Sequence, residues 1–220
     1  MLIWVLGQSR SAISSIISQY LGANKLDEVK NLPAQAITII LFLSIIICVG
    51  TLPFSDSIFR FYNATGTLLE YSVDYYKIRI IGFPFTLYTF AVFGVFRGLQ
   101  NTYYPMLIAI TGAVINILLD VLLVYGVEDL FQPLYLKGAA IASVLAQFLM
   151  AALPTYFILK KTEIPLKIYK PINKELPKFL NMIGHLIIRT LALNTALYFA
   201  ARFATGYGNA YIAAYTIAIN

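Results

Sequence analysis

The residues best suited to chemistry in this sequence are polar side chains inside otherwise apolar stretches. Asp120 follows Asn116 by four residues, so both lie on one face of the same predicted helix. Ser143 and Gln147 repeat this spacing in the next apolar stretch. One carboxylate, two amides and a hydroxyl form an oxygen-rich set, which suits a hard cation such as Na⁺ or a transferable proton. No cofactor is expected beyond such an ion.

The depths of these four side chains match in pairs. At about 1.5 Å per residue, Asp120 lies roughly 9 Å and Asn116 roughly 15 Å below the outer end of their segment. The next segment returns after a short connection, so Ser143 is expected at the level of Asp120 and Gln147 at the level of Asn116. Two interpretations stay open. The set is either a site for a coupling ion, with Na⁺ held by Asp120, Asn116 and Ser143, or a structural polar clamp between two helices.

A stripe of small hydroxyl residues runs along the first apolar stretch, 1–21. Its members recur at helical spacing: Ser11, Ser14, Ser15 and Ser18. Larger apolar side chains fall on the opposite face: Ile13, Ile16 and Ile17. In a membrane, a stripe of small residues either lets another helix approach closely or lines a polar cavity. Both interpretations stay open here.

The composition around these residues is that of a membrane protein. Of 220 residues, 60% are hydrophobic and 12% are charged, whereas soluble domains carry about 25% charged residues. The apolar runs predict six membrane segments and the beginning of a seventh. Their ranges are 1–21, 33–52, 67–98, 105–126, 138–159 and 179–204, with 209–220 beginning the seventh.

The 67–98 segment is longer than one straight span requires. Its first part mixes charged residues with tyrosines, which favours an interfacial or protein-buried turn. Asp74 lies near Lys77 and Arg79 there, and an interfacial salt-bridge cluster explains all three. Pro84 is expected to kink the apolar part of the segment.

Loop charge predicts the orientation of the segments. The loops 22–32, 97–104 and 160–178 hold nine Lys and Arg residues, whereas the alternate loops hold three. This bias places the first set in the cytoplasm, because positively charged loops stay on that side. The net charge of +6 is concentrated in the 160–178 loop, which argues against a nucleic-acid partner.

Signatures of enzyme chemistry do not occur in this sequence. It has no G-x-x-x-x-G-K-[ST] phosphate loop, no H-E-x-x-H and no G-x-S-x-G motif. Cys48 is its only cysteine and His185 its only histidine, which excludes an internal disulfide and the usual zinc sites. We therefore expect a protein that is not an enzyme.

Several motifs resemble those of the multidrug and toxic compound extrusion (MATE) family of efflux transporters. In chain order they are ISQYLGA at 17–23, a Gly-Phe-Pro kink at 82–84, RGLQNTYYP at 97–105, NILLD at 116–120 and GAAIASVLAQ at 138–147. Each motif is weak alone, but together they are specific and cover most of 8–150. The fourth helix of the family pattern and the stretch 189–194 look closest to its DinF-like branch.

The resemblance implies an all-α integral membrane bundle, in which two six-helix lobes surround a central cavity. On that pattern, 1–159 is the N-terminal lobe without its first helix, 160–178 is the cytoplasmic linker, and 179–220 begins the C-terminal lobe. The chain would then hold helices two to seven and the start of eight. The resemblance also implies that Asn116 and Ser143 belong to a cation network with Asp120.

The implied function is export across the cytoplasmic membrane by alternating access. A small cationic or amphipathic molecule would leave in exchange for Na⁺ or H⁺. The other expected partners are the lipid bilayer and the remaining helices of a longer transporter. A longer protein is expected because the apolar stretch 211–220 reaches only about 15 Å, half of a hydrocarbon core.

Two other functions stay open. A lipid-linked oligosaccharide flippase of the same superfamily would share the two-lobe plan, but it would line its cavity with several basic residues, and few are expected to be buried here. A non-transporting membrane scaffold would not require a deep carboxylate such as Asp120 to face a cavity.

Overall fold

The chain forms a bundle of long helices. The computed structural model describes residues 6–61, 64–126, 132–162, 164–166 and 171–206, and no strand occurs among them. The helices are α2 (Ser9–Gly22), α3 (Leu26–Val29), α4 (Leu32–Thr51), α5 (Ser55–Phe61), α6 (Gly66–Arg79), the 3-10 turn η1 (Ile80–Gly82), α7 (Phe83–Gly98), α8 (Tyr103–Tyr125), α9 (Tyr135–Lys161) and α10 (Leu176–Gly206).

Five stretches of helix are long and apolar enough to cross a membrane. They are Leu26–Thr51, Gly66–Gly98, Tyr103–Tyr125, Tyr135–Lys161 and Leu176–Ala200. These stretches confirm the predicted segments from 33–52 to 179–204. The predicted 1–21 segment is represented by the 14 described residues of α2, and 209–220 lies outside the described residues. The chain is thus a multi-pass, all-α membrane protein.

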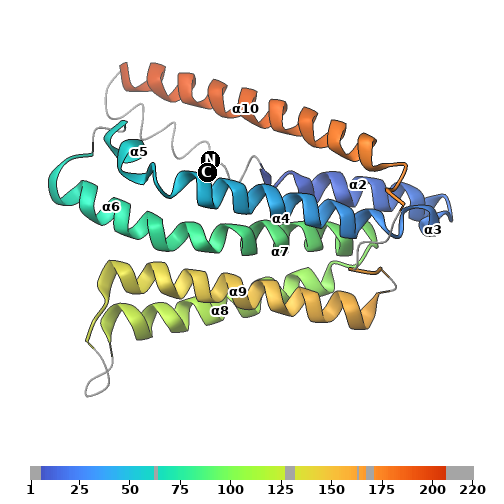
Figure 1. Ribbon diagram of the computed structural model, residues 1–220, viewed down its shortest axis with the longest axis horizontal. Coiled ribbons are helices and arrows are strands. Elements are labelled where there is room, and N and C mark those ends of the chain that lie inside the picture. The colour runs from blue at the N-terminus through green and yellow to red at the C-terminus, as the bar shows by residue number, and fades with distance from the viewer. Residues whose placement is uncertain (1–5, 62–63, 127–131, 163, 167–170, 207–220) are drawn as a thin grey trace.

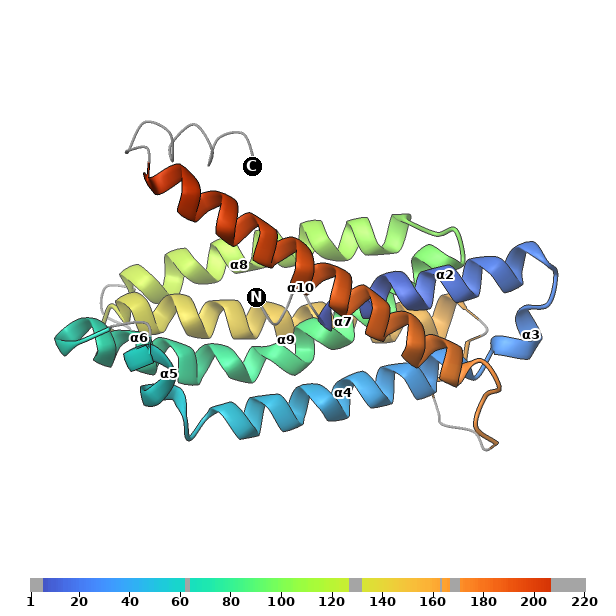
Figure 2. The same cartoon turned by 90° about the horizontal axis from the view of Figure 1, so that it is seen from above.

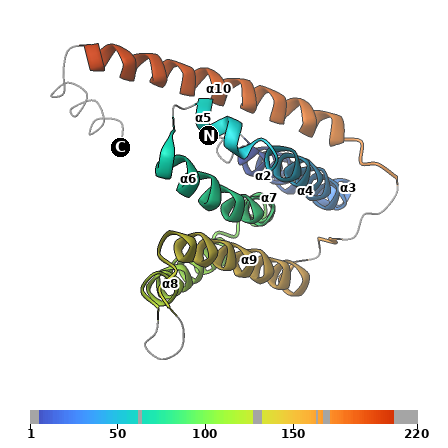
Figure 3. The ribbon, with the colours of Figure 1, turned by 60° about the vertical axis from the view of Figure 1, so that its left-hand side comes forward.

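The helices pack in layers (Figure 1). α8 and α9 form a pair on one flank, α10 crosses the opposite flank, and α2, α4, α6 and α7 lie between them, as Figure 3 also shows. Seen from above, α10 runs diagonally across the other helices (Figure 2). The principal core lies between α2, α4 and α7 and takes in Phe179 at the start of α10.

The two faces predicted for the first segment are present in α2. Ile13, Ile16 and Ile17 are buried in the core, whereas Ser11 is exposed. Ser14, Ser15 and Ser18 are half-buried, so the opposite face of the helix is only partly covered within the described structure.

Close packing of α2 against α7 depends on two glycines. A Cβ atom on Gly94 would lie 2.6 Å from the carbonyl oxygen of Arg10, and one on Gly98 would lie 2.6 Å from Cβ of Ile17 and 3.1 Å from the carbonyl oxygen of Ser14. Because the contacts advance in the same direction along both helices, α2 and α7 run parallel. Small residues four positions apart permit such an approach of two membrane helices.

The long 67–98 segment is interrupted just before Pro84. Proline has no N–H group, so it cannot bond the carbonyl oxygen four residues earlier, that of Ile80. The Phe83 N–H group bonds this oxygen instead, which closes the 3-10 turn η1. Pro84 then lies in the first turn of α7, where a missing N–H group leaves no intrahelical bond unmade.

The first part of the same segment differs from the prediction. It forms the helix α6 rather than a turn, and Asp74 pairs with Lys137 of α9, whose Nζ lies 3.0 Å from Oδ2. Lys77 and Arg79 lie nearer in sequence, but no ion pair of either with Asp74 occurs among the described residues. The packing of α6 against α9 brings Lys137 to the carboxylate, a contact that sequence spacing along one helix does not reveal.

The predicted linker, 160–178, contributes to both flanking helices. α9 ends at Lys161 and α10 begins at Leu176. Between them, Gln35 of α4 donates from Nε2 to the Pro171 carbonyl at 3.3 Å and accepts at Oε1 from the Asn173 N–H group at 3.0 Å. This amide therefore holds the described end of the linker against the bundle.

Candidate coupling site and cavity

The polar residues predicted to carry ion chemistry lie on α8 and α9, which are antiparallel neighbours. Two glycines bring the helices close together. A Cβ atom on Gly112 would collide with the side chain of Met150, and one on Gly138 would collide with the carbonyl oxygen of Leu123. The predicted adjacency of these two segments is therefore confirmed.

These contacts define the register of the pair. Interpolation between them places Asp120 opposite residues 141–142 and Asn116 opposite residues 145–146. The partners expected from sequence, Ser143 and Gln147, lie within two residues of those levels, or about 3 Å along the helix. Matching depth is a condition for a shared site, and this condition is met.

The α8 half of the set faces α9. Asn116 follows Gly112 by four residues and lies on the stripe that contacts α9, whereas Asp120, one turn further, lies about 80° around the helix from Gly112, at the edge of that stripe. Nδ2 of Asn116 is buried and has no hydrogen-bond partner among the described residues. Asp120 is half-buried, and within the described part of the chain it has no ion pair or hydrogen bond.

On α9, the Gln147 side chain of the set contacts the turn η1. Oε1 of Gln147 is buried without a hydrogen-bond partner in the described structure, and it occupies the space beside Gly82 of η1. Ser143 lies one turn earlier on the same face of α9. No hydrogen bond joins any two of the four side chains within the described residues, so their role as one ion network stays a prediction.

A metal ion in the described part of the chain would have few charged ligands. In the described ranges, no group of three or more His, Cys, Asp or Glu residues is placed to hold a metal ion. A Na⁺ ion near Asp120 would therefore have one carboxylate ligand and would require neutral oxygen atoms for the rest of its coordination.

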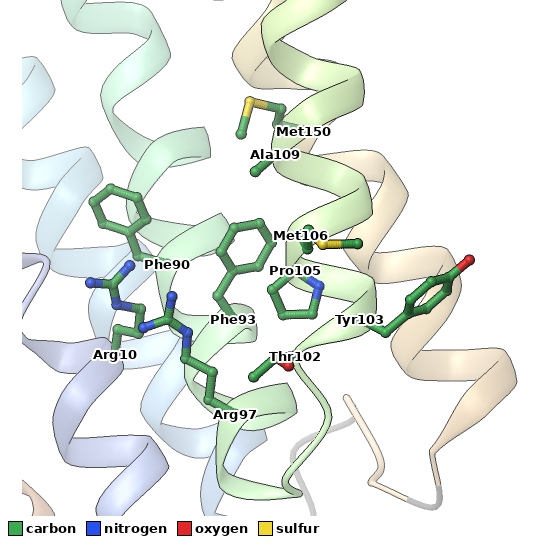
Figure 4. A pocket seen from close by; sticks show the side chains of 10 residues that line it. All are labelled: Arg10, Phe90, Phe93, Arg97, Thr102, Tyr103, Pro105, Met106, Ala109 and Met150. Carbon is green, nitrogen blue, oxygen red and sulfur yellow. The ribbon is translucent and has the colours of Figure 1, made fainter.

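A cavity of about 690 Å³ opens between α2, α7, α8 and α9. It falls in the size range of small-molecule sites. Its wall combines two arginines with aromatic and sulfur-containing side chains (Figure 4). The lining residues are Arg10, Phe90, Phe93, Arg97, Thr102, Tyr103, Pro105, Met106, Ala109 and Met150.

The serine stripe borders a smaller cavity of about 260 Å³. Ser11, Ser14 and Ser15 line it together with Arg10 and Arg97. The fourth serine, Ser18, does not line it, and its hydroxyl bonds the Ser15 carbonyl at 3.1 Å. Since the Ser14 backbone also packs against Gly98, the stripe combines the two arrangements expected of it, a close helix contact and a polar wall.

Sequence reasoning missed Arg10 and treated Arg97 as loop charge. The sequence signal that could have placed the two arginines together is the pair Gly94 and Gly98. Two glycines at this spacing let a neighbouring helix approach closely, and Arg97 lies between them. The presence of both arginines at one cavity also weakens the expectation that few basic residues lie inside the lobe.

Comparison with known protein sequences identifies relatives of one kind. The family model MatE matches residues 1–122. Multidrug export protein MepA of Staphylococcus haemolyticus is 26% identical over 204 residues, which are 91% of this chain and 44% of the relative. Protein DETOXIFICATION 43 of Arabidopsis thaliana is 30% identical over 152 residues, 69% of this chain and 28% of the relative. The chain thus spans less than half the length of these relatives.

Solved structures share the fold. A MOP superfamily transporter from Pyrococcus furiosus superposes with a TM-score of 0.86 at 23% identity, over 98% of this chain and 48% of its own. A MATE transporter in a bent conformation gives a TM-score of 0.87 at 23% identity, over 97% of this chain and 48% of its own. At these identities the likeness shows the helical arrangement alone.

Proposed function

This chain belongs to the MatE family, and on that premise we propose that it forms part of a transporter which exports small organic compounds in exchange for Na⁺ or H⁺. The relative from Staphylococcus haemolyticus is named a multidrug export protein, which supports export as the activity. The proposed cycle is alternating access, in which the ion and the exported compound favour different states of the helix bundle.

The observation that carries the ion coupling is the position of Asp120. It lies at the edge of the α8 stripe that faces α9, one turn from Asn116, whose Nδ2 is buried without a partner in the described structure. An aspartate within a membrane helix costs about 2.5–3.5 kcal/mol on insertion scales. An ion or a proton bound at Asp120 offsets this cost by neutralising the carboxylate.

Each side chain has a distinct part in this proposal. Asp120 supplies the charge that binds Na⁺ or takes up the proton. Asn116 supplies a neutral ligand, since a half-turn of its amide exchanges Nδ2 for Oδ1. Ser143 offers a hydroxyl near the same level. The position of the Gln147 amide depends on the packing of α9 against η1, because its Oε1 lies beside Gly82.

Coupling follows from the close packing of α8 on α9. Both helices approach at glycines, so a small displacement of either changes the contacts at both ends of the interface. Ion occupancy at Asp120 would change the charge between the helices and thereby favour one packing over another. The bound ion can shift the equilibrium only by its difference in affinity for the two states.

The test is Asp120→Asn in the intact transporter reconstituted in liposomes. Export of a fluorescent organic compound is measured while a Na⁺ gradient or a proton gradient is imposed separately. The substitution preserves shape and removes the titratable charge, so we expect normal insertion and loss of gradient-driven export. Asp56→Asn is the matched control, because Asp56 lies on α5 in an exposed ion pair with Arg60. Gradient-driven export by Asp120→Asn at the wild-type rate would refute the proposal.

A further inference from the structure

Two arginines from different helices meet at the larger cavity. Arg10 comes from α2 and Arg97 from the last turn of α7, and both line each of the two adjoining cavities. Figure 4 shows both side chains extending toward the cavity, and the two charges lie close enough to interact electrostatically. Like charges held together in a membrane protein are unfavourable unless something compensates them.

No carboxylate in the described part of the chain provides that compensation. The ion pairs recorded there involve Lys25, Lys30, Arg60, Lys137 and Lys178. Arg10 instead lies over the ring of Phe90, with Cζ 5.4 Å from the ring centroid. A cation–π contact orients the guanidinium but leaves its positive charge in place. The cavity therefore carries uncompensated positive charge within the described structure.

The backbone holds the two arginines together. Gly94 admits the Arg10 backbone, because any Cβ there would lie 2.6 Å from the Arg10 carbonyl oxygen. Arg97 follows three residues later on α7, between Gly94 and Gly98. Their backbones cannot separate without opening the α2–α7 contact, so both guanidinium groups stay within reach of a common ligand.

The orientation of the chain in the membrane explains the position of Arg97 but not that of Arg10. Arg97 lies at the predicted cytoplasmic end of α7, where basic residues are common. Arg10 is level with Gly94, four residues before the end of α7, which corresponds to about 6 Å along the helix. A basic residue placed deeper, and aimed at the same cavity as Arg97, requires another explanation.

Most of the remaining wall of the cavity is apolar. Phe90, Phe93, Met106 and Met150 provide aromatic and thioether surface, and methionine adapts its shape to varied ligands. Guanidinium groups recognise phosphate and carboxylate by paired hydrogen bonds. The two kinds of wall therefore suit a ligand with an acidic group at one end and an apolar body at the other.

We propose that this cavity binds an amphipathic organic anion, with Arg10 and Arg97 holding its phosphate or carboxylate group and the aromatic and methionine wall holding its apolar part. In taking this anion to be the exported compound, the inference rests on the proposed function. It narrows the sequence expectation of a cationic or amphipathic substrate to an amphipathic one that carries negative charge.

The first test measures binding to the purified intact transporter. The probes are 1-naphthyl phosphate and the neutral 1-naphthol, which share the same ring system. We expect the phosphate to bind at least about tenfold more tightly, since charge-assisted hydrogen bonds are among the strongest available. Equal affinity for the two probes would overturn the inference.

Variants then locate the site. Arg10→Gln and Arg97→Gln should each remove most of the preference for 1-naphthyl phosphate. Arg60→Gln, which removes one charge from the exposed helix α5, should leave it unchanged. A preference that survives both cavity substitutions would place the anion elsewhere and overturn the assignment. Should either variant fail to fold, raising salt from about 0.15 M to about 1 M must weaken binding of the phosphate relative to naphthol in the unaltered protein. An unchanged ratio would overturn the inference.

The source of the anion is decided in nanodiscs. The affinity for 1-naphthyl phosphate is compared in phosphatidylcholine alone and with added phosphatidylglycerol. Competition by phosphatidylglycerol would identify a membrane phospholipid as the occupant, and no competition would identify a free solute. Both results support the anion site, and its loss in Arg10→Gln must accompany either.

Failure of this inference is separable from failure of the proposed function. Gradient-driven export without selective binding of 1-naphthyl phosphate would leave the transporter proposal intact and overturn the anion site. Selective, arginine-dependent binding without gradient-driven export would support the site and contradict the proposed coupling.

Discussion

The amide oxygen of Gln147 on α9 occupies the space in which a side chain at position 82 would lie, so a larger residue at Gly82 would require this amide to move. Gly82 belongs to η1, the 3-10 turn that forms because Pro84 cannot bond the Ile80 carbonyl. The polar side chain of Gln147 thus packs against the backbone irregularity between α6 and α7. This contact connects the α6–α7 interruption to the proposed ion site.

The first prediction concerns this contact. Gly82→Ala would force the Gln147 amide out of its position, and because this amide is the flexible end of its side chain, the cost should lie near or below the lower limit of overpacking, about 1 kcal/mol. We expect a lower thermal unfolding temperature for the intact transporter, measured in detergent. Gly50→Ala is the matched control, because no atom lies within 4 Å of the added Cβ. Equal unfolding temperatures for the two variants would contradict the contact.

A second prediction tests the α2–α7 pair. Gly98→Leu places a large side chain against Ile17 and the Ser14 carbonyl, so the parallel helices must separate. We expect reduced stability and weaker binding of 1-naphthyl phosphate, because Arg10 and Arg97 lose their common support. The measurements are thermal unfolding and equilibrium binding.

The matched control for that variant is Gly184→Leu on α10, where the added Cβ meets no atom within 4 Å. Stability and binding close to those of the unaltered protein are expected for it. If both leucine variants behaved alike, the glycine contact between α2 and α7 would not hold the arginines together.

Much of the fold was predictable because its causes are local. The lengths of the apolar runs, and the turn and charged residues between them, located the membrane helices. The four-residue spacing of Asn116 and Asp120 located their shared face. The short connection after 126 indicated that α8 and α9 are neighbours. Their register followed to within two residues, because both helices rise by the same distance per residue.

Contacts between distant segments were not predictable in this way. The Gly82–Gln147 contact and the Arg10–Arg97 pair each join segments that are more than 60 positions apart. Helical periodicity identifies which face of a helix is apolar, but it does not identify which neighbour covers that face. The predicted partners of Asp74, Lys77 and Arg79, were wrong for this reason, because Lys137 of α9 forms the ion pair with Asp74.

A third prediction concerns the linker. Gln35 is 6% exposed and bonds both the Pro171 carbonyl and the Asn173 N–H group. Gln35→Leu leaves both backbone groups without this partner, at a cost of about 1–3 kcal/mol for an unsatisfied buried group. We expect faster tryptic cleavage after Lys174 in membranes that expose the cytoplasmic face. Gln19→Leu, an exposed change on α2, should leave the cleavage rate unchanged.

A fourth prediction follows from Glu175, which lies beside α2 just before α10 begins. The Tyr20 hydroxyl and the Lys178 ammonium hold the pKa of Glu175 below its ordinary value of 4.5. A lowered native pKa means that the contact contributes stability above the ordinary value and loses it as the pH falls through the lowered one. Cleavage of the linker by pepsin, divided at each pH by the rate on an unfolded substrate, should therefore rise as the pH falls below the ordinary value of 4.5. Glu175→Gln should remove this pH dependence, and a dependence that persisted would assign it to another group.

The last prediction separates ion coupling from a structural clamp at Asn116. Its Nδ2 is buried without a hydrogen-bond partner in the described structure, and an unmade bond of this kind costs about 1–3 kcal/mol. Asn116→Leu keeps the branched outline of the side chain and removes that cost, so thermal stability should stay the same or increase. Gradient-driven export should nevertheless fall, because Asp120 loses a neutral oxygen ligand one turn away. Ile117→Leu, on the exposed face of α8, is the control and should change neither property. A clamp predicts the reverse result, in which Asn116→Leu lowers the unfolding temperature and export declines only in proportion to the folded protein.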